Sequence, residues 1–193
     1  MQGPSGHDRQ PSRPAGADAS GKAGQPTGKD VISAAELGAV LEKHRTWVAS
    51  GWEMGKRADL HGSDLHGRKL PGALLADADL HRADLHRVAL PAAELDGADL
   101  HRADLHDADL KGADLQYADL HEADLHRADL RGAVLREADL HNADLHGADM
   151  KHADLTEADL RGANLRNVKG LTPEQLAGAR TDRSTRLPAS IKP

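Results

Sequence analysis

The sequence of 193 residues contains no cysteine and no phenylalanine, and only two tryptophans and one tyrosine. Without cysteine the chain can form neither a disulfide framework nor a thiolate metal site. No apolar run reaches the length of about 18 residues that indicates a membrane helix, and the amino terminus lacks the apolar segment of a secretory signal. We therefore expect a soluble, cytoplasmic protein that does not bind membranes.

The usual catalytic signatures are also missing. The chain has no cysteine nucleophile, no glycine-rich phosphate loop and no His-Glu-x-x-His motif. Aspartate and histidine are abundant, but the repeat described next places them on a convex surface without a pocket. The sequence therefore predicts a protein that is not an enzyme and that holds no cofactor.

What the chain does contain is a five-residue repeat between Ala58 and Val168. Leucine stands at every residue number divisible by five from Leu60 to Leu165, except at Met150, and these positions define 22 units that follow the pattern Ala-Asp-Leu-x-x with some substitutions. A helix advances about 100° per residue and a strand alternates its faces, so neither keeps leucines five apart on one side. A chain that turns one corner per unit does. We therefore predict a solenoid with alanine and leucine inside.

The residue after each leucine shows a longer period of 20 residues. Histidine fills this position in two consecutive units, other residues fill it in the next two, and this pattern recurs five times. A square coil of four units explains the longer period, and duplication of a 20-residue block explains it as well. Glycine is frequent at the second variable position, where corners need permissive backbone angles.

The unit resembles the repeat of the pentapeptide repeat family, whose consensus is a small residue, Asp or Asn, Leu or Phe, and two variable residues. The likeness covers about 110 of the 193 residues. It implies an all-β solenoid, namely a right-handed quadrilateral β-helix with four repeats per coil. About 22 pentapeptides then give five to six coils, and a strand spacing of about 4.8 Å gives a rod about 26 Å tall.

The segments that flank the repeat complete the predicted organisation. Residues 2–30 contain no large apolar residue, so they cannot offset the entropy of ordering. Capping boxes at Ser33–Glu36 and Thr172–Gln175 predict short α-helices that cap both ends of the solenoid. The prediction begins with a disordered tail at residues 1–30 and an N-terminal capping helix with a linker at 31–57. The β-helix follows at 58–168, and a C-terminal capping helix at 169–180 and a polar tail at 181–193 complete the chain.

Charge is unevenly distributed along the chain. Residues 58–168 carry 23 acidic and 12 basic side chains, a net charge of −11, whereas the flanking segments together carry +5. An acidic rod disfavours direct binding of nucleic acid and favours basic partners, including proteins that themselves bind DNA. Charged outer faces also keep any solenoid in solution, so charge alone identifies no partner.

Ten of the 13 histidines fall into two columns, each histidine preceded by an aspartate two residues earlier. The histidine columns are His61, His81, His101, His121 and His141, and His66, His86, His106, His126 and His146. The candidate acidic binding face consists of Asp59, Asp79, Asp99, Asp119, Asp139 and Asp159, and of Asp64, Asp84, Asp104, Asp124 and Asp144. A candidate apolar contact side consists of Leu74, Tyr117 and Val134.

Three interpretations of the histidine columns stay open. Imidazole and carboxylate are suitable ligands for Zn, Ni or Cu, although a flat ladder spreads ligands apart and predicts no specific metal site. Imidazoles also titrate near neutral pH, so protonating all ten would cancel most of the charge of −11. Alternatively, the columns are exposed polar residues that duplication has multiplied.

These observations favour a binding or scaffold protein that acts on a protein partner through the outer faces of an acidic rod, as a monomer or a homodimer. The resemblance adds an alternative, because well-understood relatives protect DNA gyrase from quinolones or toxins with acidic rods that resemble duplex DNA. Under it, the two aspartate columns form the DNA-like face. Those relatives often carry Phe at the repeat centre and dimerise through an apolar carboxyl-terminal surface, and this sequence shows neither feature. A metal-binding or pH-responsive surface is the second alternative.

Overall fold

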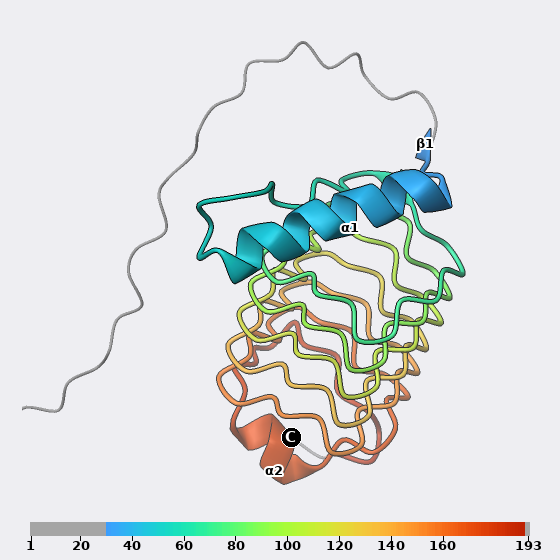
Figure 1. The fold of residues 1–193 in the computed structure, drawn as a ribbon. Coiled ribbons are helices and arrows are strands. Elements are labelled where there is room, and N and C mark those ends of the chain that lie inside the picture. The colour runs from blue at the N-terminus through green and yellow to red at the C-terminus, as the bar shows by residue number, and fades with distance from the viewer. Residues whose placement is uncertain (1–29, 192–193) are drawn as a thin grey trace, which may run out of the picture.

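The computed structural model describes residues 30–191. Apart from Asp30, the predicted disordered tail at residues 1–30 lies outside the described residues. The helices and strands of the described part are β1 (Asp30–Val31), α1 (Ala34–Ala49), β2 (Ser63–Asp64) and α2 (Pro173–Ala177). Between the two helices the chain winds into a stack of coils, with α1 across one end of the stack and α2 at the other (Figure 1).

Neighbouring coils are joined by short parallel bridges between residues 20 positions apart. Asp59, for example, pairs with Asp79, and the same spacing recurs along the stack. Four five-residue units therefore make one coil, and the coil has four sides. We number these sides by their first paired residues, so that sides 1, 2, 3 and 4 begin at Asp59, Asp64, Lys69 and Leu74.

The leucines and alanines of the repeat point inward, as the sequence predicts. From Leu75 to Leu165, every leucine of the repeat and Met150 are at most 1% exposed. Burial of one leucine side chain stabilises a fold by about 2 kcal/mol, so this leucine stack is the main source of stability. It also fixes which residues face outward, because the side chain between the alanine and the leucine must point away from the core.

Each corner is a tight turn of two residues, which we call the first and second corner residues. After the corner, the N–H of Ala83 donates a hydrogen bond to the carbonyl of Leu80 at 2.9 Å, and this bond recurs along the stack. The second corner residue has a positive φ at every corner from Gly62 to Asn167. A type II turn requires this geometry, which glycine adopts without strain.

Helix α1 packs one face against the first coils. Leu37 and His44 are buried, and Val40 and Leu41 are partly buried against the same hydrophobic cluster. The capping boxes predicted for both helices are present, because each N-cap side chain and its partner three residues later exchange hydrogen bonds. Neither helix of the described part has the length and apolarity needed to cross a membrane.

The carboxyl-terminal segment differs from the polar tail predicted for residues 181–193. Arg180 pairs with Asp159 on side 1, Arg186 pairs with Asn164 on side 2, and Ile191 is only 9% exposed. The segment therefore extends the stack up to residue 191. It pairs through backbone groups, which require no Ala-Asp-Leu unit, so the sequence pattern could not reveal it.

Candidate functional site

The repeated aspartate satisfies a backbone donor at each corner. In the five-residue unit that contains Asp119, the backbone N–H of His121 donates no hydrogen bond to a backbone carbonyl, whereas the N–H groups of the other four residues do. The Asp119 carboxylate accepts this remaining hydrogen bond at 2.9 Å, and Asp139 does the same for His141. The aspartates of the predicted acidic face therefore stand at regular positions because the fold needs them locally.

The bridged aspartates of sides 1 and 2 include all the residues of the predicted acidic face. The two histidine columns lie at the corners that follow these sides. Most neighbouring imidazoles stack, as His66 and His86 do with ring centroids 4.1 Å apart and planes at 10°. In two other pairs the rings are turned against each other, because the planes of His101 and His121 lie at 68° and those of His126 and His146 at 87°.

Several histidines also contact the aspartate of their own unit. The Nδ1 atoms of His86 and His106 lie 2.7 Å from carboxylate oxygens of Asp84 and Asp104. At the start of the first column, Nδ1 of His61 lies 3.2 Å from its own aspartate. These contacts join the imidazoles of the first coils to the carboxylates of their own units, so histidine and aspartate form a mixed surface there.

Side 3 carries carboxylates as well, but basic corner residues compensate them. Lys111 lies 3.0 Å from Asp109 and 3.7 Å from Asp129, and Arg131 donates two hydrogen bonds to Asp129 at 2.8 Å. These hydrogen bonds from Arg131 hold the pKa of Asp129 below its usual value. Side 3 therefore carries no net negative charge.

Sides 1 and 2 lack this compensation. Within the described part of the chain, the ion pairs of their aspartate columns are made with histidine, except that Asp159 pairs with Arg161. Lys and Arg carry a permanent positive charge, whereas a neutral imidazole brings none to its carboxylate partner. By residue count, the units of sides 1 and 2 together carry a net charge of −7 and those of side 4 carry −6, whereas those of side 3 carry +2.

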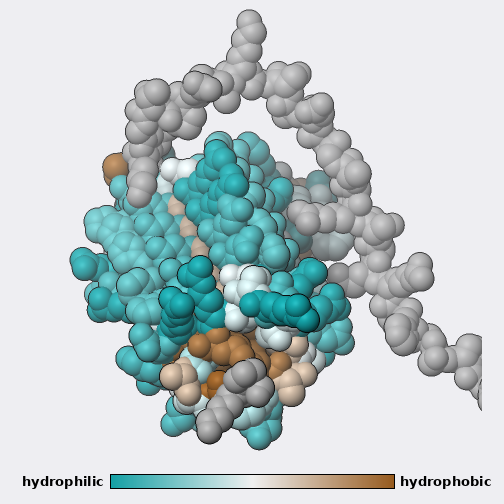
Figure 2. Space-filling model, turned by 180° about the vertical axis from the view of Figure 1, so that it is seen from behind, coloured by the Kyte–Doolittle hydropathy of each residue, from teal (hydrophilic) through white to brown (hydrophobic). Residues whose placement is uncertain are grey.

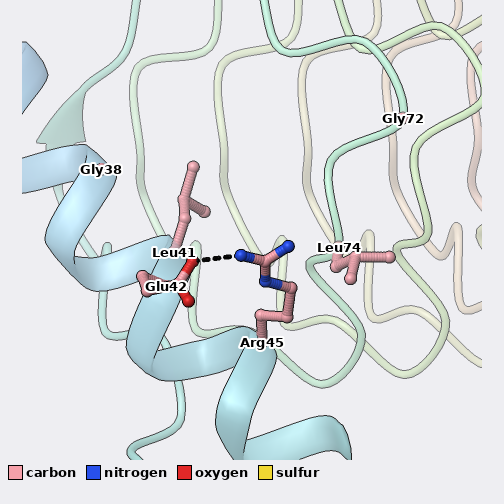
Figure 3. Close-up of a pocket in the computed structure, with 6 residues that line it drawn as sticks. All are labelled: Gly38, Leu41, Glu42, Arg45, Gly72 and Leu74. Atoms are coloured by element: carbon pink, nitrogen blue, oxygen red, sulfur yellow. Dashed lines mark hydrogen bonds and ion pairs between the residues drawn. The ribbon is translucent and has the colours of Figure 1, made fainter.

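The predicted apolar residues do not form one continuous patch. Leu74 and Val134 share side 4, but Glu94 and Asp114 lie between them in the same column. Tyr117 is 58% exposed at the corner that follows this side. Leu74 instead lies beside α1, in a pocket of about 390 Å³ (Figure 3). The residues that line this pocket are Gly38, Leu41, Glu42, Arg45, Gly72 and Leu74.

A more compact apolar area lies at the carboxyl-terminal end of the stack. Figure 2 shows brown surface there, on a molecule that is otherwise mostly teal in this view. Leu176, Leu187 and Ile191 line a shallow pocket in this region. The sequence predicted only a small helix and a polar tail here, because these apolar residues are far apart along the chain.

Three groups of side chains have the composition of metal ligands. In each group, one ligand atom per residue lies within 4.8 Å of the others. The groups are His101, His121 and Glu122; Asp84, His86 and Asp104; and Asp104, His106 and Asp124. The sequence placed the histidines and aspartates in columns but missed Glu122. One sequence feature could have pointed to Glu122, namely that it is the only acidic second corner residue after side 1. The second corner residues after side 1 are Gly62, Arg82, Arg102, Glu122, Asn142 and Gly162.

Comparison with known proteins identifies the repeat. A family model described as pentapeptide repeats matches residues 58–91, 93–132 and 133–169, in eight copies. No curated protein matches the chain. Solved proteins that carry this repeat form right-handed β-helices.

Three of the similar solved structures show how far the likeness extends. The pentapeptide repeat protein Rfr23 from the cyanobacterium Cyanothece 51142 is 27% identical, with a TM-score of 0.41, over 64% of this chain and 90% of that one. A pentapeptide repeat protein from the Arabidopsis thaliana thylakoid lumen is 32% identical, with a TM-score of 0.30, over 62% and 72%. QnrB1, a plasmid-mediated fluoroquinolone resistance protein, is 18% identical, with a TM-score of 0.39, over 65% and 78%.

Proposed function

The chain belongs to the pentapeptide repeat family, and on this premise we propose that it is a non-enzymatic binding protein that acts through the outer faces of its β-helix. In this proposal, about 22 pentapeptides form five to six coils at residues 58–168. Helices α1 and α2, within residues 31–57 and 169–180, cap the two ends. The caps protect the apolar ends of the leucine stack and leave the sides available for a partner.

Sides 1 and 2 are the proposed binding surface. The observation that carries this proposal is that, Asp159 apart, the ion pairs of their aspartate columns within the described part of the chain are made with histidine, whereas those of side 3 are made with Lys or Arg. Uncompensated carboxylates repeated once per coil attract a basic protein surface and orient it. The partner in this proposal is therefore a protein with a row of Lys or Arg side chains.

Two triple variants test the proposal with matched charge changes. One replaces Asp99, Asp119 and Asp139 of side 1 by asparagine, and the other replaces Asp109, Asp129 and Asp149 of side 3 in the same way. Partners captured by the immobilised wild-type protein are purified, and their dissociation constants are measured for both variants. We expect the side 1 variant to lose about tenfold in affinity or more, and the side 3 variant to change less than about twofold. Equal losses would contradict the proposal.

DNA mimicry is the second candidate function, with DNA gyrase as the partner. It is supported by the aspartates of sides 1 and 2, which repeat once per coil as a linear array of negative charge. Gyrase supercoiling by purified enzyme, with and without a quinolone, tests it. Inhibition or drug protection that the side 1 triple variant loses would support mimicry, and no effect at micromolar protein would exclude it.

A partner that binds the apolar residues of side 4 would behave differently. Val134→Asp would then weaken binding, whereas the side 1 triple variant would not. Val134 is the better choice for this test, because Leu74 lies beside α1. Substitution of Leu74 would therefore disturb the proposed cap as well as the outer surface.

A further inference from the structure

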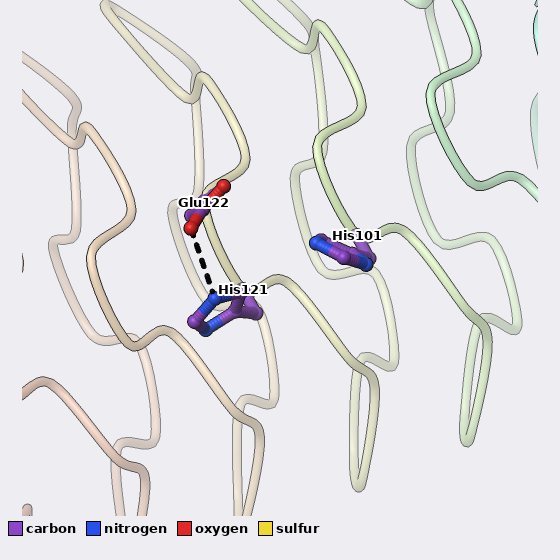
Figure 4. Close-up of side chains that lie close together, drawn as sticks. All are labelled: His101, His121 and Glu122. Atoms are coloured by element: carbon purple, nitrogen blue, oxygen red, sulfur yellow. Dashed lines mark ion pairs between the residues drawn. The ribbon is translucent and has the colours of Figure 1, made fainter.

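His101, His121 and Glu122 meet at the corner after side 1, where two neighbouring coils lie against each other. One nitrogen of each imidazole and one oxygen of Glu122 lie within 4.8 Å of one another. Figure 4 shows the two imidazoles on adjacent coils and Glu122 beside His121. Two imidazoles and a carboxylate are the ligand set that suits Zn²⁺ and related divalent ions.

The orientation of the rings distinguishes this step of the column from its neighbours. His81 and His101 stack with planes at 21°, and His121 and His141 stack at 11°. Between them, His101 and His121 lie at 68° with centroids 5.2 Å apart. Stacked rings direct their nitrogen lone pairs in parallel, whereas rings turned against each other can direct them at one point.

The contacts of the three side chains agree with a shared ion. Nε2 of His121 lies 3.2 Å from Oε1 of Glu122, close to the separation of about 3.3 Å between ligands of a tetrahedral ion with bonds of about 2.0 Å. Nε2 of His101 is buried and has no hydrogen-bond partner among the described residues. A buried ring nitrogen without a partner loses its hydration, and a metal ion would restore an interaction for it.

The other two groups are less suitable. In the groups built around His86 and His106, each Nδ1 already contacts the aspartate of its own unit at 2.7 Å. These two rings are also nearly parallel, at 5°. Each of these two groups therefore offers a single imidazole, and the Nδ1 of that imidazole already contacts a carboxylate.

Arg102 is the neighbour that opposes a metal ion. Its guanidinium donates a hydrogen bond to Oε2 of Glu122, which leaves Oε1 for an ion. The positive charge of Arg102 repels a bound cation, and its removal should therefore strengthen binding.

We propose that His101, His121 and Glu122 bind one Zn²⁺ ion and thereby link two neighbouring coils. Three protein ligands leave the fourth tetrahedral position to water or to a side chain of a partner. The site goes beyond the proposed binding surface, because it requires a specific ligand geometry at one corner rather than the net charge of two sides.

Titration calorimetry of the full-length protein with Zn²⁺ at neutral pH tests the site. We expect one ion per chain, and a loss of about tenfold in affinity or more in each of His101→Gln, His121→Gln and Glu122→Gln. His81→Gln is the matched control, because it removes one imidazole from the same column outside the site, and it should change the affinity less than about twofold. Arg102→Gln should bind Zn²⁺ more tightly.

Two controls make the result decisive. The melting temperature of each variant in the presence of a chelator should match that of the wild type, since none of these side chains lies in the core. Zn²⁺ should raise the melting temperature of the wild type and not that of His121→Gln, because an ion that binds only the folded state stabilises it. Binding of several ions per chain, or an equal loss in His81→Gln, would show that exposed histidines bind Zn²⁺ independently and would overturn the proposal.

Discussion

The Asp119 carboxylate accepts a hydrogen bond from the backbone N–H of His121 at 2.9 Å, two residues further along the chain. In one unit of side 3, Ala89 holds the position equivalent to Asp119 and Pro91 the position equivalent to His121. Proline has no N–H to donate. Aspartate is thus absent where its hydrogen bond would have no donor. The repeated aspartate serves the corner first, and its charge is available to a partner in addition.

This dual role predicts different effects for two substitutions of the same residue. Asp119→Ala should lower the free energy of unfolding by about 1 kcal/mol, because the N–H of His121 loses its acceptor. Asp119→Asn should be nearly neutral, because an asparagine side-chain oxygen can accept the bond, as Asn164 does from the N–H of Arg166. Chemical denaturation measures both values. Equal destabilisation would mean that the charge, and not the hydrogen bond, matters at the corner.

The left-handed backbone at the second corner residue predicts opposite effects on stability for a glycine-to-alanine and an alanine-to-glycine substitution at equivalent corners. Gly112 has a φ of +61° and open space where a Cβ would lie, so Gly112→Ala should cost about 1 kcal/mol through backbone strain alone. Ala92 has a φ of +54° at the same corner of the preceding coil, so Ala92→Gly should be neutral or stabilising. Denaturation midpoints compare the two, and destabilisation by Ala92→Gly would contradict this view of the corner.

His44 predicts a dependence of stability on pH at the N-terminal end. Its Nδ1 accepts a hydrogen bond from the N–H of Ala58 at 3.0 Å, and its side chain is fully buried. Burial lowers the pKa of His44, as does the charge of Arg57, whereas the carbonyl of Ala76 and the charge of Asp77 partly oppose this. Protonation would remove the acceptor and place a charge in the contact between α1 and the first coil.

Because the pKa of His44 is lower in the folded state than in the unfolded state, its contribution makes the protein less stable as the pH falls. The stabilisation by His44 is complete above its unfolded-state pKa of about 6.5, and it is lost as the pH falls from there through the lower folded-state pKa. Trp47 stacks on His44 with ring centroids 5.6 Å apart, so tryptophan fluorescence reports on this contact. In His44→Gln the amide can still accept the bond but does not titrate, so the fluorescence change with pH should disappear. An unchanged profile would show that other groups cause it.

The sequence predicted the coil and its core because both follow from one uninterrupted period. The leucine column fixes the interior, and no side-chain detail at the surface can shift it. Ser33 and Thr172 were also predictable as N-caps, because a capping box is a local pattern of four residues. These features depend only on neighbours along the chain or on the period itself.

The features that sequence missed depend on contacts between coils. Glu122 approaches His101 from the next coil, and the turned ring of His121 depends on its rotamer, which the repeat does not specify. Arg186 pairs with side 2 through its backbone alone. Likewise, only the position of α1 shows that Leu74 lies in a pocket and not on an open apolar side.

The salt dependence of partner binding shows whether the carboxylates of sides 1 and 2 form the binding surface. The dissociation constant of one purified partner is measured against salt concentration for the wild type and for the two triple variants. We expect a steep salt dependence for the wild type and the side 3 variant, and a clearly shallower one for the side 1 variant, because salt screens only the charges that are present. Identical slopes for all three proteins would contradict the proposal.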